Sequence, residues 1–166
     1  MVRVIMDDTG SGKTKQLIDL ANAAVKTEHG NVICIEPKNE LTYDIDYNIR
    51  LIAANEYELP SYEAFKGFLS GMYAGNYDIT HVFVDNLTKI IRDNNEAQVE
   101  RFLDWLDAFS EKNRIKFTIT MSAKAEWAAD GITKDTVKLE DKETLEKAEK
   151  ALEEAKRLME IQRCMD

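Results

Sequence analysis

Residues 10–14, GSGKT, have the residue types of a phosphate-binding loop. Gly10 and Gly12 let backbone N–H groups turn toward phosphate oxygens, because neither residue has a Cβ. In the pattern G-x-x-x-x-G-K-[ST], Lys13 would bind the β- and γ-phosphates and the Thr14 hydroxyl would bind Mg²⁺. A tight turn without a ligand is the alternative. The position between an apolar run and a helical pattern favours a nucleotide site, with contacts from Thr9, Gly10, Ser11, Gly12, Lys13, Thr14 and Lys15.

The first glycine of that pattern is replaced by Asp7. Asp enters left-handed backbone conformations more readily than most residues, so the turn can survive. Charge is the larger obstacle, because two unit charges about 4 Å apart interact by roughly 4 kcal/mol at an effective dielectric of about 20. Asp7 could instead pair with Lys13 and hold the empty loop in shape. The sequence therefore predicts a nucleotide site that is weakened.

A second acidic residue, Asp85, ends the apolar run HVFVD at residues 81–85. Many buried strands end in Asp, but together with the loop this one resembles a Walker B acid that holds Mg²⁺. Asn86 stands where many ATPases have a catalytic glutamate. Glu36, at the end of another apolar run, is the alternative carboxylate for orienting an attacking water, or else a solvated strand end. The candidate catalytic residues are Lys13 and Glu36, and the candidate metal ligands are Thr14 and Asp85.

These residues belong to a chain in which β-rich runs alternate with helical patterns. Strands are expected near residues 2–6, 32–35, 49–55, 81–85 and 116–123, and helices from about 14, from 61 and over 95–112. Asp93 with Glu96 predicts a capping box at the last of these helices. Thr120 and Ser122 are either sensor-like groups between loop and acid or ordinary strand residues. The alternation predicts a three-layer α/β/α sandwich with a mostly parallel sheet.

The last part of the chain, from residue 141, is almost wholly Glu, Lys, Ala, Leu and Arg. Its apolar residues recur at intervals of three and four, which predicts one long helix. The helix either forms a coiled-coil seam that dimerises the protein or lays one stripe on its own sheet. Fewer than four heptads make a weak seam, which favours the second interpretation. We therefore expect a nucleotide-binding domain over residues 1–135 and a C-terminal helix over 136–166, packed on that domain.

Composition limits the classes of function. The 166 residues, 44% hydrophobic and 32% charged, fit one globular domain. The net charge of −9 argues against non-specific binding to nucleic acid or anionic membranes, which needs a basic surface. Neither a signal peptide nor a membrane span is recognisable, so a cytoplasmic location is expected. Cys34 and Cys164 lack metal-ligand spacing and are expected to be reduced thiols.

Four segments together resemble a family of small P-loop ATP-binding proteins of Firmicutes, some of which are described as twitching-motility ATPases. They are GSGKTKQLIDLAN, YDIDYNIRLI, EAFKGFLSGMYAGNYDI and VFVDNLTKI. The resemblance covers roughly residues 1–125 and implies a RecA-like P-loop NTPase fold. It also implies nucleotide binding at residues 10–14, with Asp85 in the Walker B role. The family pattern has glycine where this chain has Asp7, and commonly glycine where it has Asn86, so both binding and hydrolysis are expected to be impaired.

Three functions fit these observations. The leading one is a Mg²⁺-dependent ATP-binding protein that acts as a slow ATPase or a nucleotide switch. A nucleoside or small-molecule kinase is the second, although the chain lacks the paired zinc cysteines of thymidine-kinase-like enzymes. The third is a non-enzymatic interaction module with a relic loop, in which the terminal helix binds a protein partner or a second copy.

Overall fold

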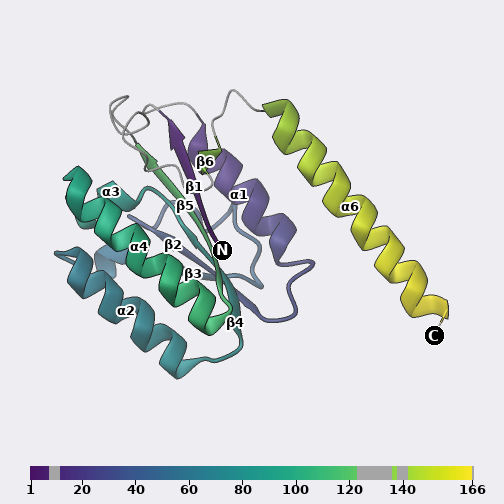
Figure 1. The fold of residues 1–166 in the computed structure, drawn as a ribbon, viewed down its shortest axis with the longest axis horizontal. Coiled ribbons are helices and arrows are strands. Elements are labelled where there is room, and N and C mark those ends of the chain that lie inside the picture. Colours follow the sequence, from purple (N-terminus) through teal and green to yellow (C-terminus); the bar gives the residue numbers. More distant parts are fainter. Residues whose placement is uncertain (8–11, 123–135, 138–141, 166) are drawn as a thin grey trace.

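The computed structural model describes residues 1–7, 12–122, 136–137 and 142–165. They form an α/β fold around one sheet, which Figure 1 shows with helices on either side of it. The strands are β1 (Val2–Asp7), β2 (Asn31–Glu36), β3 (Arg50–Ala53), β4 (Ile79–Val84), β5 (Lys116–Ser122) and β6 (Thr136–Val137). Their order across the sheet is β3-β2-β4-β5-β1-β6, and every neighbouring pair is parallel. The expected parallel sheet is confirmed.

The helices cover both faces of this sheet, as a parallel sheet requires. The helices of the described residues are α1 (Lys13–Ala24), the short 3₁₀ helix η1 (Ala54–Glu56), α2 (Tyr62–Gly75), α3 (Leu87–Ile91), α4 (Glu96–Asn113) and α6 (Lys142–Met165). Figure 1 shows α2 and α4 together on one side and α1 on the other. Strand β2 explains the arrangement, because its side chains alternate: Val32 and Cys34 pack with α1, whereas Ile33 and Ile35 pack with α2 and α4.

Side chains of the preceding residues cap the first turns of α2 and α4. Ser61 caps α2, since its side chain accepts a hydrogen bond from the N–H of Ala64. The expected capping box of Asp93 and Glu96 is wrong. The cap of α4 is Asn95, whose side chain accepts from the N–H of Gln98. The Asp93 carboxylate instead accepts from the N–H of Asn95 and shapes the turn before the helix.

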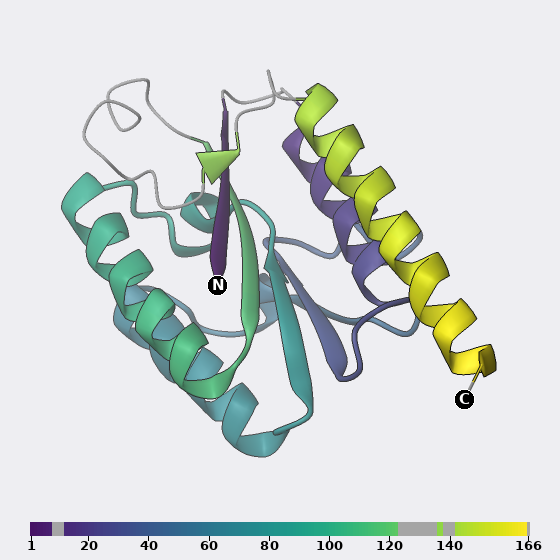
Figure 2. The same ribbon diagram turned by 45° about the vertical axis from the view of Figure 1, so that its right-hand side comes forward.

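Helix α6 forms as the sequence predicts, and the apolar side chains described between residues 151 and 161 are exposed. Leu152, Leu158, Met159 and Ile161 are each about half exposed or more. Figures 1 and 2 show α6 at the outside of the molecule, on the α1 side. The division at residue 135 and the packing of this helix on the domain therefore stay predictions. Within the ranges that the structure describes, no helix is long and apolar enough to cross a membrane.

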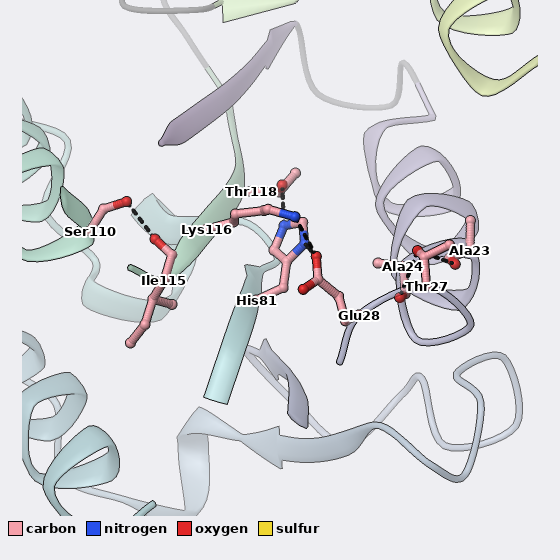
Figure 3. A network of polar contacts seen from close by, with 9 residues as sticks. All are labelled: Ala23, Ala24, Thr27, Glu28, His81, Ser110, Ile115, Lys116 and Thr118. Atoms are coloured by element: carbon pink, nitrogen blue, oxygen red, sulfur yellow. Dashed lines mark hydrogen bonds and ion pairs between the residues drawn. The ribbon is translucent and has the colours of Figure 1, made fainter. Parts of the chain in front are cut away.

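A polar network ties α1 to the amino ends of β4 and β5 (Figure 3). Glu28, just beyond α1, accepts from the Lys116 amine at 2.7 Å and lies 3.5 Å from Nδ1 of His81. The other His81 nitrogen lies 2.9 Å from the Thr118 hydroxyl. The hydrogen bond from His81, then that from Lys116, outweigh burial and lower the pKa of Glu28 to about 2. This network fixes the end of α1 that is remote from the candidate site.

Candidate functional site

The amino end of α1 brings a lysine to the carboxyl ends of β1 and β5. Gly12 is the N-cap residue and has φ +87°, a left-handed conformation that favours glycine. Lys13 follows as the first helical residue, and its side chain is buried. Its amine donates to the Ser122 hydroxyl at 3.3 Å. The positive end of the helix dipole and the lysine amine therefore lie together, which favours an anion there.

Thr14 and Asp85 meet next to this lysine. The Thr14 hydroxyl lies 3.1 Å from Oδ1 and 3.3 Å from Oδ2 of Asp85. The backbone N–H of Asp85 donates to the Ile35 carbonyl at 2.8 Å, which holds the residue at the end of β4. The two candidate metal ligands named from the sequence therefore lie within hydrogen-bond distance of each other. Their use in binding a metal stays a proposal.

The Asp85 carboxylate is buried, and its environment has opposing effects on its charge. Burial raises the pKa of Asp85, because the ionised form loses water. Hydrogen bonds from Thr120 and Thr14 act in the opposite direction, as do the charges of Lys89 and Lys13. The effect of burial is the larger one, so the pKa of Asp85 is raised and its ionised form is disfavoured. A cation beside it would relieve that cost.

Thr120 sets the position of the acid from the neighbouring strand. Its hydroxyl donates to Oδ1 of Asp85 at 3.0 Å and accepts from the N–H of Asn86 at 2.9 Å. Asn86 has φ 55° and begins α3. The sequence allowed two interpretations of Thr120, a sensor-like group or an ordinary strand residue, because a sequence alone does not show the order of the strands. The order places β5 between β1 and β4, and Thr120 therefore lies between β1, the strand that leads into the loop, and the acid.

Glu36 lies at the same edge of the sheet, at the end of β2. Its Oε1 accepts from the N–H of Glu40 at 2.6 Å and of Leu41 at 3.2 Å. The side chain is 1% exposed, and burial raises its pKa. The alternative interpretation as a solvated strand end is therefore wrong. The carboxylate closes the turn after β2, and its catalytic use stays a prediction.

A pocket of about 90 Å³ lies between these elements. Its walls come from α1, from the turn after β2, and from the end of β4 with the start of α3. The lining residues are Thr14, Glu36, Pro37, Lys38, Glu40, Leu41, Asp85, Asn86 and Lys89. Room for several water molecules beside a carboxylate and a hydroxyl suits a hydrated cation.

The remaining expected site residues lie in or next to the part of the loop that the structure does not describe. Thr9, Gly10 and Ser11 lie outside the described residues, and Lys15 is exposed on α1. Asp7 is the last residue of β1, in register with Ser122 of β5. Its backbone is therefore extended, and the left-handed conformation considered from the sequence does not apply. The contacts of its side chain lie outside the described part of the chain.

The donor set fits Mg²⁺ bound with a phosphate. Mg²⁺ prefers oxygen ligands and usually keeps several waters, with one or two carboxylates and substrate phosphates completing its shell. Thr14 and Asp85 would supply such oxygens, and Lys13 would bind the phosphate. Within the described ranges, no cluster of three or more His, Cys, Asp or Glu side chains forms an all-protein metal site. The residues thus suit a metal that arrives with its ligand.

Comparison with models of protein families and with curated protein sequences finds no match for this chain.

Proposed function

We propose that the protein binds Mg²⁺ with a nucleoside triphosphate, ATP being the expected ligand, through a P-loop NTPase site of RecA-like type. The observation that carries this proposal is the contact of Thr14 with Asp85 beside the buried amine of Lys13. These three side chains are the minimum set that a triphosphate and its metal need: a cation for phosphate, a hydroxyl and an acid for Mg²⁺.

The sheet topology supports the same function. In open α/β sheets, ligands bind outside the carboxyl ends of the strands, where the direction of the strand order changes. From β1 the chain crosses to β2 and β3 on one side, then returns through β4 to β5. The carboxyl ends of β1, β5 and β4 therefore flank such a point, and Lys13, Thr14 and Asp85 lie there.

Each residue has a defined task when the nucleotide is bound. Lys13 compensates phosphate charge, and Gly12 lets the backbone turn into α1. Thr14 and Asp85 would hold the metal, with Thr120 orienting the acid. Mg²⁺ would supply charge neutralisation on the phosphate oxygens. Hydrolysis is expected to be slow, because Asn86 is a poor proton acceptor and Glu36 is committed to two backbone N–H groups.

The test compares Lys13→Ala with Lys26→Ala, which removes an exposed lysine just after the end of α1. Calorimetric titration of ATP, with and without Mg²⁺, should show at least about tenfold weaker binding for Lys13→Ala only. Circular dichroism should show both variants folded. Equal ATP affinities of the wild type and Lys13→Ala, or no ATP binding by the wild type, would contradict the proposed function.

A further inference from the structure

The described part of α6 carries an apolar face whose side chains are exposed. Residues spaced by three and four share one side of a helix. On α6 these are Ala151, Leu152, Ala155, Leu158 and Met159, called here the α6 apolar face. All five are exposed, with Leu152 at 48%, Leu158 at 63% and Met159 at 60%. A helix of 24 residues, about 36 Å long, thus presents one apolar strip outward.

The remaining sides of the helix are mostly charged. Glu153, Arg157 and Glu160 lie there, and all are exposed. Isolated helices of ordinary composition are marginal in water, and most of their stability comes from burying an apolar face. Contiguous exposed apolar surface rimmed by charge is typical of protein–protein contacts. The α6 apolar face therefore needs a partner helix or groove.

The size of the side chains on this face fits a second copy of the same helix. If two α6 helices run antiparallel with Leu152 facing Ala155 of the second copy, then Ala155 faces Leu152 in return. Both Leu152 side chains thus meet an alanine, which lets the helices approach closely while the gap is filled. The two-fold symmetry of such a pair repeats every favourable contact.

Charge selects the antiparallel orientation. Glu149 and Lys156 lie along the same edge of the α6 apolar face. In the antiparallel pair, Glu149 of each copy comes beside Lys156 of the other, which gives two opposite-charge pairs. In a parallel pair, that edge would face Ala151 and Leu158 instead, so neither charge would have a partner across the seam.

We propose that α6 is a dimerisation helix, which pairs antiparallel with α6 of a second copy of this chain through the α6 apolar face. The two copies are joined by contacts of Leu152 with Ala155 and of Glu149 with Lys156. This pairing is independent of nucleotide binding, because none of its residues belongs to the candidate site.

The first experiment compares Leu152→Glu with Ile161→Glu in the full chain. Ile161 lies about two and a half turns after Leu152, hence on the opposite side of the helix, and is similarly exposed at 51%. Both variants gain the same charge. Sedimentation over a range of concentrations should show a wild-type dimer, with Leu152→Glu weakening association by about tenfold or more. Ile161→Glu should associate like the wild type.

The second experiment tests the orientation by exchanging charges. Glu149→Lys alone places Lys beside Lys, and Lys156→Glu alone places Glu beside Glu, so each variant should associate at least about threefold more weakly. An equimolar mixture of the two should form a heterodimer, because every lysine then faces a glutamate. A wild-type monomer at all concentrations, a dimer untouched by Leu152→Glu, or no recovery on mixing would overturn the proposal.

Discussion

The hydroxyl of Thr14 lies within 3.3 Å of both carboxylate oxygens of Asp85, although 71 residues separate them in the chain. The contact joins the first turn of α1 to the end of β4 across the intervening strand β5. Thr120 of that strand completes the arrangement by donating to the same carboxylate. In the proposed function, this hydroxyl and this buried acid would share one cation.

Asp85→Asn is expected to stabilise the protein without ligand while abolishing Mg²⁺-dependent ATP binding. Asn keeps an oxygen for the hydrogen bonds of Thr14 and Thr120 and removes the buried charge. The pKa of Asp85 is raised on folding, so its ionisation lowers stability as the pH rises through the folded pKa. The stability of the variant relative to the wild type should therefore increase as the pH rises from acid to neutral.

Urea unfolding at several pH values measures this difference, with Asp19→Asn on the exposed side of α1 as the control. A variant less stable than the wild type at pH 7 would show that nearby lysines already balance the Asp85 charge.

Asp7→Gly is expected to strengthen Mg-ATP binding by at least about tenfold, or roughly 1.4 kcal/mol. Glycine restores the pattern of the loop and removes a carboxylate at the end of β1, the strand that leads into the loop. The gain should be larger for ATP than for adenosine, because the carboxylate acts on phosphates, and it should shrink as salt rises. Titrating ATP, ADP and adenosine against both proteins at two salt concentrations checks this. Equal ATP affinities would mean that the carboxylate points away from the phosphates.

Glu28→Gln is expected to lower the free energy of unfolding by about 1 to 2 kcal/mol at pH 7. The folded pKa of Glu28 is about 2, below its ordinary value of 4.5, so the stabilisation is present above pH 4.5 and is lost as the pH falls toward 2. Lys116 is half exposed, which reduces the effect below what the shift alone implies.

Chemical unfolding from pH 7 to pH 2 measures the loss. The control is Glu63→Gln, whose carboxylate pairs with Lys66 but is 81% exposed, and which should change stability by less than about 0.5 kcal/mol. A Glu28→Gln deficit that persists unchanged at pH 2 would assign the effect to packing rather than charge.

Gly30→Ala is expected to destabilise the fold by about 2 to 3 kcal/mol. A Cβ at this position would lie 2.1 Å from the Asp78 carbonyl oxygen and 2.3 Å from Cγ2 of Thr80, so the chain between α1 and β2 would have to move away from β4. Gly67→Ala is the matched control, because a Cβ on that side of α2 meets nothing within 4 Å. Alanine should stabilise α2 by about 0.5 to 1 kcal/mol. Thermal unfolding of the two variants should therefore shift in opposite directions.

The sequence by itself determined the elements and their class. Apolar runs predicted five strands, and residues three and four apart, such as Phe65 and Leu69, predicted the helices that cover them. These signals are local, because a strand or helix that must bury one face repeats apolar residues at its own period. Gly12, Lys13 and Thr14 were also recognised from the sequence, because the phosphate-binding motif is a short pattern of adjacent residues. It did not find α3 or β6, each too short to show a period.

Only the tertiary structure decided how these pieces meet. Strand order depends on contacts between distant residues, so the sequence did not show that β5 lies between β1 and β4 or that Thr120 orients Asp85. From the sequence, Glu36 was either a catalytic carboxylate or a solvated strand end. The structure shows that it is buried and accepts hydrogen bonds from N–H groups of the following turn. The spacing of apolar residues by three and four predicted the α6 helix. That these residues are exposed became visible only in the structure. Periodicity shows which side of an element is apolar, and only the assembled fold shows whether anything covers it.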